Sequence, residues 1–214
     1  MTFNLPTQSS RGLLVVLSGP SGVGKGTVVA AAVARRTNAA RRVRRSISVT
    51  TRPRRPDEKD EKDYFFCTSD EFDAKVKSGA LLEWATYLDH DYGTPADWVD
   101  EQLQAGFDVV LEIEVQGAMQ VREQRPDAVL IYMCPPSWEA LRRRLARRRS
   151  ESLEVQRRRL EVARQEIRQL PEYDYLIVNG RVAEAARTFL SILEAEHARV
   201  CRHETLPARK VNRV

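Results

Sequence analysis

The sequence predicts an α/β protein built on a doubly wound parallel sheet. Continuous apolar runs at 13–18, 107–115, 128–134 and 175–178 have the composition of strands that are covered on both faces. Helical stretches separate these runs, and strands that alternate with helices form parallel sheets. The 214 residues, 42% of them hydrophobic, suffice for one such domain with an insert.

Turn signals divide the first half of the chain. The strand at 13–18 leads into a helix that should end near Arg36, and a strand at 43–50 is stopped by Pro53 and Pro56. Residues 46–106 then break the strand–helix rhythm, so they predict an inserted lobe. Its expected parts are a charged loop at 57–63, an extended stretch at 64–66, a helix capped by Ser69 and ended by Gly79, a strand at 81–88, a turn at 90–93 and a helix from Pro95 to Gly106.

The second half returns to long elements. The strand at 107–115 carries Glu112 and Glu114 near its end, where alternation would put both on one face. Ser137 should cap an arginine-rich helix, and a longer helix should run to about Leu170. Apolar residues seven apart predict that one face of it packs: Leu153, Leu160 and Ile167, with Val155 and Val162. A helix at 182–200 closes a domain expected to span 12–200, between a flexible tail at 1–11 and a basic tail at 201–214.

Cysteine usage and hydropathy exclude several classes. Cys67, Cys134 and Cys201 are widely spaced and form no CxxC pair, and the three histidines show no metal-ligand spacing. This pattern suits a reducing cytoplasm rather than a disulfide framework or a zinc site. The amino terminus lacks the features of a signal peptide, and no apolar run approaches the ~20 residues of a membrane span. We therefore expect a cytoplasmic protein with no membrane partner.

Arginine is concentrated in two segments of the chain. Nine arginines and no acidic residue lie between Arg35 and Arg55, and nine more lie between Leu141 and Leu160 against only two glutamates. The rest of the chain is net acidic. Such cationic segments indicate a polyanionic ligand, either a nucleic acid or clustered phosphates. No RNA- or DNA-binding motif accompanies them, so a nucleic-acid partner is not expected.

A glycine-rich turn follows the first buried strand and opens the first helix. It matches G-x-x-x-x-G-K, in which backbone N–H groups curl around phosphate oxygens and the lysine reaches the β- and γ-phosphates. The sequence departs from the usual ending by placing Gly26 before Thr27, whose hydroxyl is a candidate Mg²⁺ ligand. The candidate ATP-binding residues are Gly19, Pro20, Ser21, Gly22, Val23, Gly24, Lys25, Gly26 and Thr27.

Further motifs occur in order along residues 12–200, and together they resemble the guanylate kinase family. They are far more specific than the loop alone. The stretches that carry the resemblance are Ser46 to Arg55 (SISVTTRPRR), Asp63 to Phe66 (DYFF), Leu82 to Ala85 (LEWA), Tyr92 to Thr94 (YGT), Glu112 to Gly117 (EIEVQG), Pro135 to Ser137 (PPS) and Tyr173 to Asn179 (YDYLIVN).

The resemblance implies transfer of the γ-phosphoryl group of ATP to GMP or dGMP, with Mg²⁺. Ser48, Arg52, Arg55 and Tyr64 match the positions that hold the monophosphate and base of GMP, where the planar fork of arginine fits phosphate oxygens. Glu83 and Thr94 match positions at the guanine base, Tyr92 a phosphate-side tyrosine, Glu114 a GMP position and Asn179 an ATP position. A carboxylate can accept hydrogen bonds from the ring N–H and amine of guanine, which adenine lacks there.

The resemblance also implies an arginine lid at 138–160. Arg144 and Arg148, four residues apart on one helix face, and the later Arg159 would stabilise the phosphoryl group in flight, with Lys25 and Arg52 as the other catalytic residues. Three departures from the family pattern are present. Acidic Asp57 and Glu61 replace loop glycines, Arg149 replaces a lid glycine, and Glu112 and Glu114 replace two aspartates, with Glu112 the second candidate Mg²⁺ ligand.

Two other functions remain open at this point. One is a related kinase for another phosphorylated acceptor such as a ribose bisphosphate, which would not require Glu83 and Thr94 as a guanine clamp. The other is a non-catalytic guanylate-kinase-like module that binds phosphopeptides. Such modules typically lose the loop lysine, whereas this chain has Lys25. The sequence indicates no oligomeric state.

Overall fold

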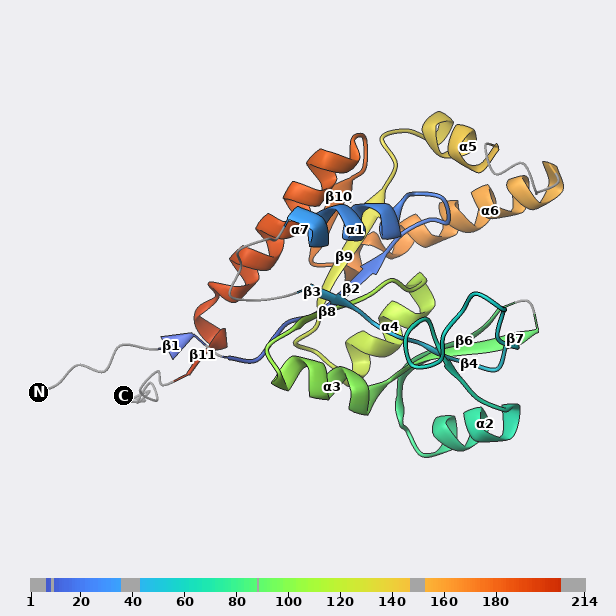
Figure 1. The fold of residues 1–214 in the computed structure, drawn as a ribbon. Coiled ribbons are helices and arrows are strands. Elements are labelled where there is room, and N and C mark those ends of the chain that lie inside the picture. Colours follow the sequence, from blue (N-terminus) through green and yellow to red (C-terminus); the bar gives the residue numbers. More distant parts are fainter. Residues whose placement is uncertain (1–6, 9, 36–42, 88, 147–152, 205–214) are drawn as a thin grey trace, which may run out of the picture.

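The computed structural model describes residues 7–8, 10–35, 43–87, 89–146 and 153–204. Five parallel strands form the central sheet in the order β10-β9-β2-β8-β3 (Figure 1). They span Tyr175–Val178 (β10), Val129–Cys134 (β9), Leu14–Ser18 (β2), Asp108–Leu111 (β8) and Val43–Arg45 (β3). The predicted doubly wound α/β class is therefore confirmed.

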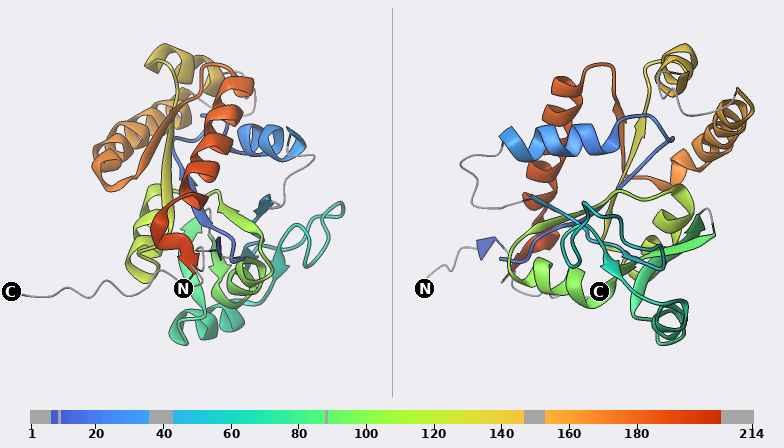
Figure 2. Two further views of the ribbon diagram at one scale, coloured as in Figure 1. Left: turned by 90° about the vertical axis from the view of Figure 1, so that its left-hand side faces the viewer. Right: turned by 45° about the vertical axis from the view of Figure 1, so that its right-hand side comes forward.

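Helices cover both faces of this sheet (Figure 2). Helix α1 (Lys25–Arg35) and helix α7 (Val182–His197) pack on the face that contains Val15 and Leu17 of β2. Helix α3 (Ala96–Gln104) and helix α4 (Val115–Gln124) pack on the opposite face, where β2 contributes Leu14 and Val16. Because neighbouring residues of β2 face opposite sides and both sides are buried, the strand is continuously apolar.

A second, smaller sheet forms a lobe beside the core. Its strands are β5 (Phe65–Phe66), β4 (Val49–Thr50), β7 (His90–Pro95) and β6 (Leu81–Tyr87), in that order. Helix α2 (Ser69–Lys77) packs Phe72 against Val49 and Leu81. Helix α3 lies within the predicted bounds of the insert, but it packs on the central sheet.

Two helices project beyond the carboxyl ends of the central strands. These are α5 (Trp138–Ala146), which Ser137 caps as predicted by accepting a hydrogen bond from Ala140 N at 3.1 Å, and α6 (Leu153–Glu166), followed by the 3₁₀ helix η1 (Ile167–Glu172). In Figure 1 they lie above the lobe on the same side of the molecule, opposite the chain termini. Their shared core contains Leu141 and Leu145 of α5 with Leu160 and Ala163 of α6. The predicted packed face of α6 is wrong at Val162 and Ile167, which are exposed.

Three local expectations in the lobe are corrected. The single strand expected at 43–50 is two strands, β3 in the central sheet and β4 in the lobe sheet, because the chain leaves one sheet for the other between them. The turn expected at 90–93 is strand β7, and the reversal lies at Asp89, whose φ is 62°. Thr68, not Ser69, caps α2, and it forms a reciprocal capping box with Glu71.

The strand expected at 107–115 ends at Leu111. Glu112 and Glu114 therefore lie beyond the strand rather than on one of its faces, and Glu114 is the N-cap residue of α4. Helix α4 was missed from the sequence, because its first turn contains Gly117, a poor helix former. The chain segments expected to be tails also contribute structure, since β1 (Thr7–Gln8) pairs antiparallel with β11 (His203–Glu204) after the short 3₁₀ helix η2 (Val200–Arg202).

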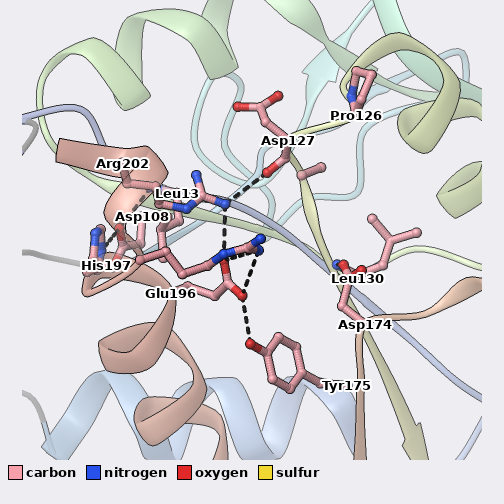
Figure 3. Close-up of polar contacts among 12 residues, drawn as sticks. Leu13, Asp108, Pro126, Asp127, Leu130, Asp174, Tyr175, Glu196, His197 and Arg202 are labelled. Carbon is pink, nitrogen blue, oxygen red and sulfur yellow. Dashed lines mark hydrogen bonds and ion pairs between the residues drawn. The ribbon is translucent and has the colours of Figure 1, made fainter. Parts of the chain in front are cut away.

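Buried polar contacts join the amino edge of the sheet to the end of α7 (Figure 3). Asp108 Oδ1 accepts a hydrogen bond from Leu13 N at 3.0 Å and lies 2.8 Å from His197 Nε2, and both polar side chains are buried. Nearby, Tyr175 Oη donates to Glu196 Oε1 at 2.6 Å. These contacts border a cavity of about 480 Å³ at the edge of the sheet away from the glycine-rich loop. Within the described residues, no helix has the length and apolar character needed to cross a membrane.

Replacing Asp108 with alanine should lower the free energy of unfolding by about 2 kcal/mol or more, because the buried Leu13 N–H loses its acceptor. Urea denaturation followed by circular dichroism measures this. Asp100→Ala is the control, since Asp100 pairs with Arg11 and Arg125 at the surface and such pairs contribute less than about 1 kcal/mol. Equal losses in the two variants would contradict the assignment.

Candidate nucleotide site

The loop between β2 and α1 lies tightly against neighbouring strands. Gly19 has φ 140° and Gly24 has φ 97°, backbone conformations that favour glycine. A Cβ atom added at Gly19 would lie 2.1 Å from the carbonyl oxygen of Met133, and one at Gly24 would lie 2.9 Å from Asn179 Nδ2. The glycines are therefore needed for contact with β9 and β10 as well as for the curl of the loop.

Side chains from four segments of the chain hold this loop. Lys25 Nζ donates to the carbonyl oxygen of Gly19, across the loop. The buried Asn179 donates from Nδ2 to Val23 O at 2.8 Å. Arg144 of α5 donates to the same carbonyl at 3.0 Å and to Asn179 O at 2.8 Å, and Arg159 of α6 donates to Ser21 Oγ at 3.0 Å. The structure thus brings two of the predicted lid arginines to the loop, whereas Arg148 lies outside the described residues.

A second cationic site lies in the lobe. The guanidinium of Arg52 lies 5.3 Å from the ring centre of Tyr64, whose ring meets that of Tyr92 edge-on at 6.1 Å. Only 12% of the Arg52 side chain is exposed. Three of the residues predicted to hold a monophosphate therefore converge.

Glu58 holds the arginines of this site, and it was not among the predicted residues. Arg52 Nη2 donates to Glu58 Oε1 at 2.7 Å, and the backbone N–H of Arg55 donates to Glu58 Oε2 at 2.9 Å. The hydrogen bond from Arg52 is the main cause that lowers the pKa of Glu58. The Arg55 side chain is exposed, and the half-buried Ser48 precedes β4, where its carbonyl accepts from Phe65 N.

Glu83 lies on strand β6 of the lobe, and its carboxyl group is buried. Its Oε1 accepts a hydrogen bond from Thr94 Oγ1 at 2.6 Å, across the β6–β7 pair. Burial raises the pKa of Glu83, and the bond from Thr94 acts in the opposite direction because it stabilises the ionised form. A Cβ atom at Gly117 of α4 would lie 2.7 Å from Glu83 Oε2, so the glycine gives this carboxyl group its place against the helix.

The two glutamates after β8 point to different partners. Glu112 forms an ion pair with Arg45 at 2.6 Å, and its Oε2 would lie 3.2 Å from a Cβ atom at Gly26. Glu114 instead lies near Glu166, the last residue of α6, whose pKa is raised to about 8 first by burial and then by Glu114. Glu166 was missed because its neighbours in the sequence show no motif.

The two predicted Mg²⁺ ligands, Thr27 and Glu112, differ in their surroundings. Gly26, not Thr27, faces Glu112, and Thr27 is exposed on the next position of α1. Among the described residues, no group of three or more acidic, histidine or cysteine side chains could hold a metal ion. The site nevertheless fits Mg²⁺ that enters with a nucleotide, since such ions use one or two carboxylates and complete their shell with phosphates and water. Glu112 beside the loop can supply one carboxylate.

A phosphate-holding loop, arginines from two projecting helices and a second cationic site in a separate lobe define a P-loop kinase that acts on a phosphorylated small molecule. Comparison with known proteins gives the family. Residues 11–196 match the family model for guanylate kinase, so the chain belongs to the guanylate kinase family and the resemblance found in the sequence is confirmed.

Individual relatives agree with the family model. The guanylate kinase of Lactococcus lactis subsp. lactis (strain IL1403) is 51% identical over 192 residues, 90% of this chain and 92% of the relative. That of Streptococcus agalactiae serotype III (strain NEM316) is 50% identical over 194 residues, 91% of each chain. The crystal structure of guanylate kinase from Anaplasma phagocytophilum has a TM-score of 0.69 at 32% identity and covers 93% of this chain and 92% of that one.

Replacing Thr94 with valine should raise the pKa of Glu83 further, because the variant loses the hydrogen bond that favours the ionised carboxylate. Carboxyl carbon NMR across a pH titration measures this, with Glu83→Gln to assign the signal. Thr86→Val is the matched control, at a threonine of β6, the strand that carries Glu83, since Thr86 Oγ1 donates to Asp91 instead. An unchanged pKa in Thr94→Val would refute the assigned bond.

Proposed function

We propose that this protein transfers the γ-phosphoryl group of ATP to GMP or dGMP, giving ADP and GDP or dGDP. The observation that carries the proposal is the buried Glu83. One of its carboxylate oxygens is engaged by Thr94 and the other lies against Gly117, in the same lobe as the cationic site of Arg52. Membership of the guanylate kinase family supports the same reaction.

ATP is the donor in this proposal. The loop from Gly19 to Thr27 offers backbone N–H groups to its phosphates, and Lys25 exchanges the Gly19 carbonyl for a phosphate oxygen. Asn179 supports the loop by holding Val23 O. Glu112 would supply the protein carboxylate for Mg²⁺ bound together with ATP, and the ion would neutralise negative charge on the phosphates.

GMP is the acceptor. Arg52 uses one part of its fork to contact Glu58 and retains further N–H donors for a phosphate, next to Tyr64 and Tyr92. Arg55 and Ser48 complete the proposed phosphate site. Ionised Glu83, with Thr94, accepts hydrogen bonds from the ring N–H and amine of guanine, and adenine would leave this buried carboxylate unpaired.

The transfer requires no general base, because a phosphate monoester is largely ionised near neutral pH. Arg144, Arg148 and Arg159, with Lys25 and Arg52, would stabilise the charge on the phosphoryl group in flight. Arg144 of α5 and Arg159 of α6 contact the loop directly. Closure of these two helices over bound ATP would bring their charges to the phosphates and exclude water. The three free cysteines suit the reducing cytoplasm that we propose as the site of action.

Coupled ADP release measured with GMP, dGMP, AMP, UMP and CMP tests the proposed reaction. Turnover should be confined to GMP and dGMP, and Glu83→Gln should reduce the preference for GMP over AMP by at least about 100-fold, since the amide cannot accept both guanine hydrogen bonds. Because burial raises the pKa of Glu83, the KM for GMP should rise on acidification at a higher pH than for an ordinary glutamate. AMP used as well as GMP would refute the proposal.

Lys25→Ala should lower kcat by about 100-fold or more, because it removes a charge that acts on the transferring phosphates. Its dissociation constant for GMP, measured by calorimetry, should stay within about threefold of the wild type, since Lys25 does not belong to the lobe. Lys77→Ala, at an exposed lysine of α2, is the control. A loss of GMP affinity as large as the loss of kcat would contradict the role of Lys25.

A further inference from the structure

Two glutamine side chains of helix α4 bind the backbone of strand β6, the strand that carries Glu83. Gln120 Oε1 accepts a hydrogen bond from Trp84 N at 3.0 Å, and Gln120 Nε2 donates to Trp84 O at 3.1 Å. One turn later, Gln124 Nε2 donates to Leu82 O at 3.2 Å. The amides of α4 therefore hold the backbone on both sides of Glu83.

Strand β6 lies at the edge of the lobe sheet. An edge strand presents backbone N–H and C=O groups that a neighbouring strand would otherwise bind. A glutamine amide has a donor and an acceptor in one planar group, as a peptide unit does. Gln120 uses both on a single residue, Trp84, so its side chain takes the place of a partner strand at this point. Because α4 also packs on the central sheet, these bonds join the lobe to the core.

Strand β6 is irregular immediately before Glu83. Leu81 pairs with Pro95 of β7 and Glu83 pairs with Thr94, so β6 has one extra residue, Leu82, between these pairs. A bulge of this kind changes the direction of nearby side chains. Leu81 packs in the core of the lobe, Leu82 packs in the central core, and Glu83 is buried as well. The bulge therefore decides where the Glu83 carboxyl group points.

One face of α4 meets the bulge. Gly117, Gln120 and Gln124 are three and four residues apart, a spacing that places them on the same side of a helix. A Cβ atom at Gly117 would lie 2.7 Å from Glu83 Oε2, so the glycine leaves room for the carboxyl group. The same helix face thus accommodates this carboxyl group and binds the backbone from which it extends.

We infer that Gln120 and Gln124 are positioning residues for recognition of the acceptor base: their amides fix the β6 backbone at the bulge and so set the direction of the Glu83 carboxyl group. This inference rests on the proposed function, in which Glu83 accepts hydrogen bonds from guanine. The donor loop is held instead by Asn179 and Arg144, which lie outside α4 and β6. Loss of the α4 amides should therefore weaken GMP binding and base selection more than ATP binding.

Steady-state kinetics of Gln120→Met test the role of the amide. Methionine keeps the unbranched shape of glutamine but lacks its donor and its strong acceptor. The KM for GMP should rise at least about tenfold, with kcat and the KM for ATP within about threefold of the wild type, and the preference for GMP over AMP should fall about tenfold. Gln124→Met should cause a smaller change in the same direction. Gln104→Met, at an exposed glutamine of α3, is the control and should change none of these values.

Two further measurements separate positioning from general disruption of the lobe. In Gln120→Met the backbone N–H of Trp84 should exchange with solvent faster than in the wild type, because it has lost its acceptor. The second measurement is a double-mutant cycle. In a Glu83→Gln background, Gln120→Met should cause no further loss of the preference for GMP over AMP, because the group through which it acts is already absent.

Each result has one meaning. Four outcomes overturn the inference and leave the proposed reaction standing: a wild-type KM for GMP in Gln120→Met, an equal rise in both KM values, unchanged exchange of the Trp84 N–H, or a full effect of Gln120→Met in the Glu83→Gln background. If Gln120→Met does not fold, Gln124→Met undergoes the same kinetic comparison, and a wild-type KM for GMP in that variant is equally contrary. A wild-type protein that uses AMP as well as GMP, or neither, overturns the proposed function instead.

Discussion

The close contact between the phosphate loop and the ends of β9 and β10 is the constraint on which the rest of the structure depends. Gly19 lies on the Met133 carbonyl and Gly24 on the Asn179 amide, so there is no room for side chains at either position. This contact fixes the direction in which the loop amides point. It also places the Val23 carbonyl where Asn179 and Arg144 can both reach it from separate elements. The arginines of α5 and α6 are therefore positioned by the same backbone that would hold the donor phosphates.

Arg52 and Glu83 share a second property: each has a partner in the protein and retains capacity for another. Arg52 contacts Glu58 through part of its fork, and Glu83 accepts from Thr94 at one oxygen. Such groups are oriented before a ligand arrives, which reduces the ordering that binding must otherwise cause. The partner also limits the cost of desolvating a charge in the absence of the ligand.

The central fold and the loop were predictable because they depend on local sequence. Buried strands are continuously apolar, and the loop needs glycine at fixed positions, so both leave a pattern in the residues themselves. The division of 43–50 into β3 and β4 left no such pattern, since either half suits a strand and only the two sheets decide between them. Glu166 is the same kind of case for the site. Its raised pKa depends first on burial at the end of α6, and no motif in the neighbouring sequence marks the residue.

Pairing of β1 with β11 has a consequence for the connectivity of the chain. Thr7 lies opposite Glu204, on the side of the molecule away from the lobe and the projecting helices (Figure 1). A short peptide joining these two strands would close a small loop and so cost little entropy. New ends could then be opened elsewhere on the surface, and a circularly permuted enzyme would keep the order of its central strands.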